Sequence, residues 1–260
     1  MIVLEAHNLT VSYDKQPVLW DIDFEVPEGH LVGIIGPNGS GKTTLLKAAM
    51  GILPVDSGYV KVFDKPLADV RERVSYVPQR QSVDWDFPAT VFDVCKMGRY
   101  RHGKLFGRLS KTDIEIAENA LERVGMTAYK NRQIGELSGG QQQRVFIARS
   151  LAQQADLYLM DEPFVGIDAA SEEAIINLLL EIKAEGKTVV LVHHDLHTAI
   201  EFFDWIVMLN TRVVASGPKE EVLNEENLKT AYGGKLNVLN RIAELVRKEE
   251  FPIREKRKVE

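Results

Sequence analysis

Residues 36–43 read Gly-Pro-Asn-Gly-Ser-Gly-Lys-Thr, and this run constrains the chain more than any other part of the sequence. It fills every position of the phosphate-binding pattern G-x-x-x-x-G-K-[ST]. The apolar run 31–35 before it is typical of a buried strand, and residues 44–49 after it read as a helix. A strand, a glycine loop and a helix turn backbone N–H groups toward an anion. The sequence therefore predicts a nucleoside triphosphate site rather than an ordinary glycine turn.

The residue types within this loop suit phosphate chemistry. The three glycines let the backbone approach phosphates without Cβ clashes. Lys42 is placed to neutralise the terminal phosphates, and the Thr43 hydroxyl is placed to ligate Mg²⁺. The residues expected to hold the nucleotide here are Gly36, Pro37, Asn38, Gly39, Ser40, Gly41, Lys42, Thr43 and Thr44.

A second polar glycine turn, Leu137-Ser138-Gly139-Gly140-Gln141, opens a predicted helix over residues 142–149. A serine hydroxyl and free backbone N–H groups at a helix N-terminus make a second anion site. A flexible loop with a helix cap would explain Ser-Gly-Gly alone, but it explains the whole run beside a phosphate loop poorly. The sequence itself does not say whether the two anion sites of one chain serve the same nucleotide.

With these motifs the chain resembles the ATP-binding cassette (ABC) family, and the resemblance covers nearly all of it. The run 137–141 matches the family signature, which closes over ATP held by the phosphate loop of another subunit. The resemblance therefore implies a dimer of two copies with two ATP molecules at the interface. It implies an α/β fold, in which a P-loop core with a mostly parallel sheet carries an antiparallel β layer and a helical subdomain. The signature residues expected at the nucleotide are Ser138, Gly139, Gly140 and Gln141.

The apolar run 157–160 ends in two carboxylates, Asp161 and Glu162, as a buried strand would before a charged turn. By resemblance, Asp161 orients Mg²⁺ and Glu162 is the general base that polarises the attacking water. Phosphoryl transfer is catalysed mainly by positioning and charge neutralisation, so one group must hold the metal and another must aim the water. Without the two glycine motifs, a charged turn would be the better interpretation.

Two histidines follow the predicted strand 187–192. His194 matches the family's switch histidine, which senses the γ-phosphate and orients the water. His193 stands where the family often has Thr or Ser. A metal site made by both is the alternative, but adjacent strand residues point to opposite faces and cannot readily chelate one ion.

Three further positions carry over from the family. Gln79 matches the glutamine that reaches Mg²⁺ and links the site to a membrane partner, although Gln81 lies close by. Tyr13 sits where the family stacks an aromatic ring on adenine, and a strand tyrosine at the solvent edge is the competing interpretation. Asp168 occupies the dimer-contact loop. The expected catalytic residues are thus Glu162, His194, Lys42 and Gln79, and the expected Mg²⁺ contacts are Thr43, Gln79 and Asp161.

Composition sets broader limits on the 260-residue chain. A hydrophobic content of 45% with 27% charged residues is ordinary for a globular protein. The net charge of −6 argues against nucleic acid as the main partner. The sequence has no run of about 20 apolar residues and no signal-peptide pattern. The single cysteine, Cys95, excludes an internal disulfide and fits a buried packing role in a reducing compartment.

The resemblance implies one ABC ATPase domain over residues 1–240, with a helical subdomain at about 81–150, followed by a charged tail at 241–260. Residues 1–80 read as short strands and turns. Apolar spacing over 112–124 predicts an amphipathic helix, and 137–217 alternates helix and strand. Residues 218–240 read as short helices and turns.

The large apolar residues Trp85, Phe87 and Val91 interrupt a polar segment, and exposed they would form a docking patch. In ABC transporters this surface receives the membrane permease. Packing within the helical subdomain is the alternative. Residues 84–88, 97–100 and 164–170 look like those of ATPase subunits of bacterial manganese, zinc or iron importers.

We therefore expect an ATPase that energises import of a transition-metal ion, peripheral on the cytoplasmic face of the membrane. Its partners would be a second copy, permease subunits and, indirectly, an external metal-binding protein. The nearest alternative is a siderophore or haem importer. A soluble ABC ATPase fits less well because the chain has no long heptad run or second cassette, and the signature argues against a small-molecule kinase.

Overall fold

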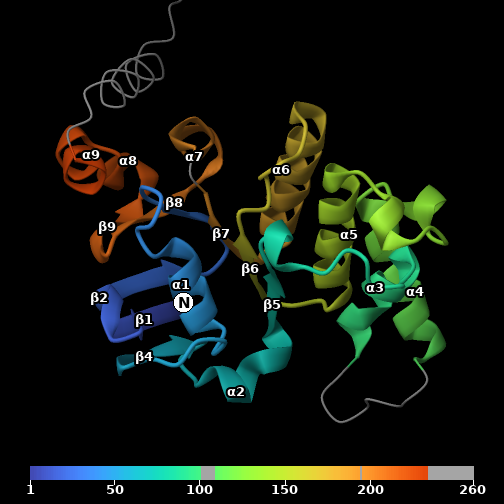
Figure 1. Ribbon diagram of the computed structural model, residues 1–260, viewed down its shortest axis with the longest axis horizontal. Helices are drawn as coiled ribbons and strands as arrows, with labels where there is room; N and C mark the ends of the chain where they lie inside the picture. The colour runs from blue at the N-terminus through green and yellow to red at the C-terminus, as the bar shows by residue number, and fades with distance from the viewer. Residues whose placement is uncertain (101–108, 194, 234–260) are drawn as a thin grey trace, which may run out of the picture.

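The computed structural model describes residues 1–100, 109–193 and 195–233. Within these residues a six-stranded core sheet has the order β5-β6-β7-β3-β8-β9 (Figure 1). Neighbouring strands pair in parallel from β5 to β8, and β9 pairs antiparallel to β8. The mostly parallel sheet expected from the sequence is confirmed. Its strands are β3 (Leu31–Ile35), β5 (Val74–Val77), β6 (Leu157–Asp161), β7 (Thr188–Val192), β8 (Trp205–Asn210) and β9 (Arg212–Pro218).

The central strands β3, β6 and β7 are each five residues long and buried at every position. Continuous apolar strands suit a parallel sheet whose two faces are both covered. Because β3, β5, β6 and β7 run in the same direction, their carboxyl ends meet at one edge of the sheet. The phosphate loop, the carboxylate pair and the expected glutamine each follow one of these ends.

A three-stranded antiparallel sheet, ordered β2-β1-β4 among the described residues, forms the predicted second layer. Its strands are longer than the short strands we expected, because β1 and β2 span twelve residues each. Register shifts along β1 interrupt the pairing and let this long pair bend. The helix after the phosphate loop lies between the two sheets, with Leu45 and Leu46 in a shared core. These elements are β1 (Ile2–Tyr13), β2 (Gln16–Pro27), β4 (Ser57–Val62) and α1 (Lys42–Ala49).

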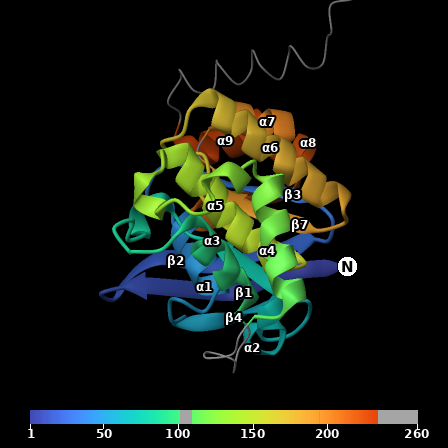
Figure 2. The same ribbon diagram turned by 90° about the vertical axis from the view of Figure 1, so that its right-hand side faces the viewer.

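A group of helices covers the side of the core sheet away from β1, β2 and β4, and Figure 2 shows these helices in front. The helix expected over 112–124 is α4, although Ile114 on its predicted apolar face is 37% exposed. The long helices are α4 (Lys111–Arg123), α5 (Gly139–Ala152) and α6 (Ala169–Ala184), and the shorter α3 (Val91–Lys96) packs against α4 and α5. The short helical segments are α2 (Leu67–Val70), η1 (Arg71–Arg73), η2 (Arg80–Ser82), η3 (Met97–Arg99), η4 (Thr127–Tyr129), η5 (Ile134–Glu136), α7 (Leu196–Phe202), α8 (Lys219–Val222) and α9 (Glu225–Tyr232).

Cys95 and the C-terminal segment were also the subject of predictions from the sequence. Cys95 is fully buried, its Sγ donates to the Ala117 carbonyl at 3.2 Å, and burial raises its pKa to about 12, as a packing role requires. Short helices occupy the described part of 218–240, and the tail 241–260 lies outside the described residues. None of the helices in the described ranges has the length and apolar content needed to span a bilayer.

Candidate nucleotide site

The phosphate loop is shaped by its packing as well as by its composition. Gly36 has φ +154°, and a Cβ there would lie 2.0 Å from the Leu209 carbonyl oxygen. Gly41 has φ +97°, and its Cβ would lie 2.5 Å from Leu19. Behind the loop, the Thr211 amide donates to the Ser40 carbonyl at 3.0 Å. The turn between β8 and β9 and the strand β2 therefore hold the loop in a conformation that only glycine permits at these two positions.

Lys42 lies inside the loop and is 5% exposed. Its ammonium donates to the carbonyl oxygens of Gly36 and Pro37, both at 2.9 Å. Burial lowers the pKa of Lys42, while the negative charges of Glu162 and Asp161 act in the opposite direction. The loop thus holds a cation beside the backbone that an anion would contact, so phosphate oxygens could compete for its donors.

Thr43 and Asp161 meet although they come from α1 and the end of β6. The threonine hydroxyl donates to Asp161 Oδ1 at 2.8 Å, and Asp161 is completely buried. Burial raises the pKa of this carboxyl, and the Thr43 hydrogen bond opposes the effect. Its Oδ2 is buried without a hydrogen-bond partner among the described residues. Hydroxyl and carboxylate oxygens are ligands that Mg²⁺ takes, so this pair fits that ion.

Glu162 follows directly after β6 with φ +49°, a left-handed conformation unusual for a residue other than glycine. Gln79, two residues after the end of β5, donates from Nε2 to Glu162 Oε2 at 2.7 Å. Gln81 is exposed and belongs to η2, so the register places Gln79 at the carboxylate. Strained backbone of this kind gathers at functional sites, and here it aims the carboxylate toward the edge that carries the phosphate loop.

The second glycine turn is a helix N-terminus with its own cap. Ser138 Oγ accepts from the Gln141 amide at 3.4 Å, and Gln141 Oε1 accepts from the Ser138 amide at 3.0 Å. A Cβ on Gly140 would lie 2.6 Å from Ser171 Oγ, which itself donates to Asp168 at 2.8 Å. This hydrogen bond and that of the Ser171 amide lower the pKa of Asp168, the N-cap of α6. The start of α6 therefore packs behind the turn.

The two expected anion sites lie apart within one chain. In Figure 1, α1 and α5 stand on different sides of β5 and β6. The helices α1 and α5 are therefore not packed side by side, and the phosphate loop before α1 is separated from the glycine turn that begins α5.

The remaining residues considered from the sequence are Tyr13, His193 and His194. Tyr13 ends β1 and is 45% exposed, so its ring is accessible. His193 is buried edge-on against Phe164 and Phe203, with ring centroids 5.3 and 6.1 Å away, which accounts for an imidazole in the core. His194 lies outside the described residues.

Arg80 was missed by the sequence reasoning. Its Nε and Nη2 donate to Gln142 Oε1 at 3.1 and 2.9 Å, and its guanidinium lies 5.7 Å from the centre of the Trp85 ring. Arg80 therefore joins the segment after Gln79 to the first turn of α5. Its position next to Gln79 was the only signal in the sequence, because arginine contacts across a fold have no fixed spacing.

The phosphate loop, the buried lysine and the adjoining carboxylates on a mostly parallel sheet define a P-loop nucleotide-binding protein. Comparison with known proteins narrows this class. The family model described as ABC transporter matches residues 19–165. The chain belongs to the ABC transporter family, and it is a nucleotide-binding, ATP-hydrolysing subunit of that family.

Individual relatives are similar over almost their full lengths. The manganese transport system ATP-binding protein MntB of Bacillus subtilis is 56% identical, over 92% of this chain and 96% of its own. The zinc transport system ATP-binding protein TroB of Treponema pallidum is 54% identical, over 90% and 88%. Among solved structures, the ADP conformation of an ATP-binding cassette of an ABC transporter has a TM-score of 0.78 with 26% identity, covering 90% of this chain and all of that one.

Lys42→Ala should abolish measurable nucleotide binding, because it removes the buried cation beside the loop. We expect the affinity for a fluorescent ATP analogue to fall by about 100-fold or more, the effect of losing charge-assisted contacts. Lys65→Ala, on an exposed lysine, is the matched control and should bind as wild type. Unchanged binding by Lys42→Ala in a titration followed by fluorescence would refute this role.

Proposed function

We propose that this chain hydrolyses ATP to power the import of a transition-metal ion, namely manganese, zinc or iron, through a membrane permease. The observation that carries the proposal is its similarity to the manganese and zinc transport proteins MntB and TroB, at 56% and 54% identity. The site geometry supports the ATPase part independently, since a phosphate loop and two acidic residues lie at one edge of the sheet. By this proposal the chain is peripheral on the cytoplasmic face, and an external binding protein selects the metal.

Each site residue then has a role in the reaction. Residues 36–44 bind the phosphates, with Lys42 supplying the positive charge. Mg²⁺, when bound, would neutralise developing charge on the phosphates, and Thr43, Asp161 and Gln79 would hold it. Glu162 accepts hydrogen bonding from the attacking water and aims it in line with the γ-phosphate. His194 would sense the γ-phosphate and orient the attacking water, and Tyr13 would stack on the adenine ring.

The hydrogen bond from Gln79 to Glu162 makes the general base part of a larger contact chain. Arg80, the next residue, donates to Gln142 of α5 and lies beside the Trp85 ring. A displacement of Gln79 on nucleotide binding would therefore be transmitted to this segment. These contacts support the role of Gln79 as the link between the site and a membrane partner.

A second copy of the chain completes each site in this proposal. The turn at residues 138–141 has an exposed serine and a capped helix N-terminus that can receive phosphate, yet its helix lies across β5 and β6 from α1. Two copies related by a two-fold axis would bring each such turn over the partner's phosphate loop. Asp168, behind the turn, would lie at the contact between copies.

Glu162→Gln should keep ATP binding but trap a closed dimer, because an amide cannot act as the base that readies water for attack. We expect light scattering with Mg-ATP to show twice the monomer mass, stable over the measurement. Glu225→Gln, on an exposed residue at the start of α9, is the control and should return to monomer as ATP is consumed. A purely monomeric Glu162→Gln protein would count against the shared site.

The permease contact is proposed at a groove of about 730 Å³ between the core sheet and the helical region. Its walls come from both parts of the chain, with Arg71 and Tyr76 on one side and Met97 and Tyr100 on the other. Met97 and Tyr100 are 40% and 51% exposed, so the groove offers apolar surface to a partner. An apolar hollow lined by Phe87 adjoins it at Met97.

The docking patch expected from the sequence is corrected by this geometry. Val91 is fully buried in the core. Trp85 is half-buried against Phe146, with ring centroids 5.0 Å apart, and its Nε1 donates to the Arg80 carbonyl. Phe87 remains 54% exposed. An indole finds a hydrogen-bond partner when buried, so Trp85 packs and Phe87 is the residue available to the permease.

Phe87→Ala and Trp85→Ala should therefore separate docking from packing. Phe87→Ala should change the free energy of unfolding by less than about 0.5 kcal/mol, as surface changes do, while lowering metal uptake. Trp85→Ala should cost about 2 kcal/mol, because it removes a half-buried ring and its hydrogen bond. Urea unfolding and uptake assays check both, and equal destabilisation by the two substitutions would refute the distinction.

The cargo is tested by the elemental content of cells that lack this chain, complemented with wild type or with Glu162→Gln. Manganese, zinc and iron are measured together after growth in metal-poor medium. A fall in one metal that only wild type restores is the expected result. No change in any of them would overturn metal-ion import. A fall in iron that appears only when iron is supplied as a siderophore or haem would then favour the siderophore or haem alternative.

A further inference from the structure

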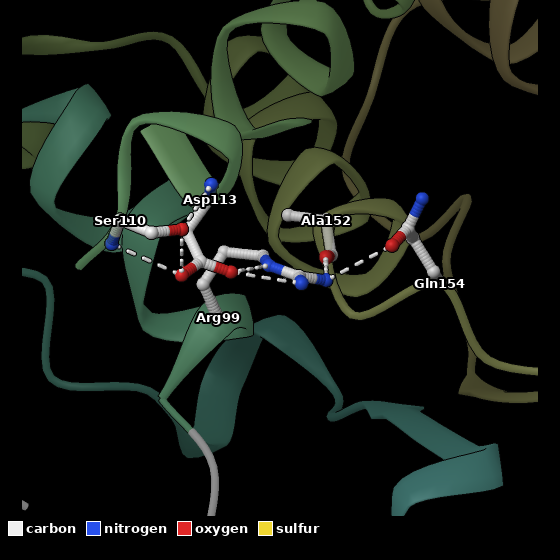
Figure 3. Close-up of polar contacts among 5 residues, drawn as sticks. All are labelled: Arg99, Ser110, Asp113, Ala152 and Gln154. Atoms are coloured by element: carbon white, nitrogen blue, oxygen red, sulfur yellow. Dashed lines mark hydrogen bonds and ion pairs between the residues drawn. The ribbon is translucent and has the colours of Figure 1, made fainter. Parts of the chain in front are cut away.

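A second polar cluster lies outside the nucleotide site, where η3, α4 and α5 meet (Figure 3). Arg99 ends η3 and is only 7% exposed. Its Nε and Nη2 contact Asp113 Oδ1 at 3.0 and 2.9 Å. Its Nη1 donates to the Ala152 carbonyl at 2.7 Å and to Gln154 Oε1 at 3.2 Å. One side chain thus ties the start of α4 to the last turn of α5.

The charges in this cluster are well compensated. Hydrogen bonds from the Ser110 side chain, followed by those from Arg99, lower the pKa of Asp113 to about 2, so the carboxylate stays ionised at neutral pH. The Ala152 carbonyl belongs to the end of α5, where intrahelical donors run out and a cation complements the helix dipole. Burying a guanidinium costs free energy unless its N–H groups find hydrogen-bond acceptors. Because the guanidinium of Arg99 is planar and rigid, its contacts to α4 and α5 hold these two helices in one relative orientation.

The backbone beside Arg99 reinforces this contact. A Cβ on Gly98 would lie 2.1 Å from the Arg149 carbonyl oxygen and 3.1 Å from the Ala152 Cβ. The chain at η3 therefore touches the last two turns of α5 directly. Gly98 and Arg99 also line the groove assigned above to the permease.

The far end of α5 carries the turn at residues 138–141. Fourteen residues make a helix about 21 Å long, so a tilt of about 10° at the Arg99 end would move the other end by about 4 Å. Hydrogen bonds to a phosphate tolerate only tenths of an ångström. The Arg80 contact to Gln142 holds the start of the helix, and Arg99 holds its end.

We propose that Arg99 is a positioning residue for the ATP-dependent dimer: by anchoring the carboxyl end of α5, it orients residues 138–141 toward the nucleotide on a second copy. This rests on the shared site described under the proposed function. Arg99 itself touches no nucleotide, so binding of ATP to the monomer does not depend on it, whereas closure of the dimer does.

The test uses the full chain carrying Glu162→Gln, with and without Arg99→Lys. Lysine keeps the positive charge and can pair with Asp113, but it cannot bridge to Ala152 as the planar fork does. We expect the affinity of the Mg-ATP dimer to fall about tenfold, the effect of one lost charge-assisted hydrogen bond, in analytical ultracentrifugation. Binding of a fluorescent ATP analogue to the monomer should stay within about twofold.

Arg123→Lys is the matched control, because Arg123 also lies on the helical region but pairs with Glu185 at 2.7 Å at the surface and not with α5. It should leave dimer affinity unchanged. If Arg99→Lys does not fold, Gln154→Asn replaces it. Asparagine tolerates the left-handed φ of +57° at this position yet withdraws the amide oxygen from Arg99, with an expected loss of about threefold.

The outcomes are separable. Equal dimer affinity with and without Arg99→Lys overturns the proposal. Parallel loss of monomer nucleotide binding, dimer affinity and Tm also overturns it, since that result indicates a merely structural role. Failure of the Glu162→Gln chain to dimerise with Arg99 intact overturns the shared site itself, and the role of Arg99 falls with it.

Discussion

Parallel pairing of β5, β6, β7 and β3 is the constraint on which the rest of the structure depends. Because parallel strands end at the same edge, residues 118 positions apart in sequence, Thr43 and Asp161, are brought within a 2.8 Å hydrogen bond. The same pairing brings Gln79 to Glu162. Of these strands, β3, β6 and β7 are buried at every position, as strands of a parallel sheet covered on both faces are.

Two layers of packing convert that edge into a shaped site. On one face, α1 and the antiparallel sheet share a core, and Leu19 of β2 presses on the loop at Gly41. On the other face, α3, α4 and α5 build a separate core with the sheet. The segment at Gln79 and Arg80 connects the helical side to the edge that carries the nucleotide site. The groove with walls from both parts is where we propose that the membrane partner docks.

The sequence reasoning succeeded where chemistry demands particular residues at fixed spacing. The phosphate loop, the carboxylates after β6 and the mostly parallel sheet were all predicted, because each depends on local motif and burial pattern. It failed where the outcome depended on packing. Val91 and Trp85 were indistinguishable from Phe87 in an apolar pattern, yet the fold buries the first, half-buries the second and exposes the third. Strand lengths in the antiparallel layer were also underestimated, since irregular register has no short-range signal.

The sequence by itself predicted a phosphate loop and the place of Lys42 and Thr43 within it, because the backbone geometry of this loop is local to the motif. Only the tertiary structure decided which distant groups act together. It paired Gln79 with Glu162, set Arg80 against α5 and buried Arg99 at the end of that helix. The physical reason is that hydrogen bonds and ion pairs between remote residues depend on distances fixed by packing, and packing has no period in the sequence.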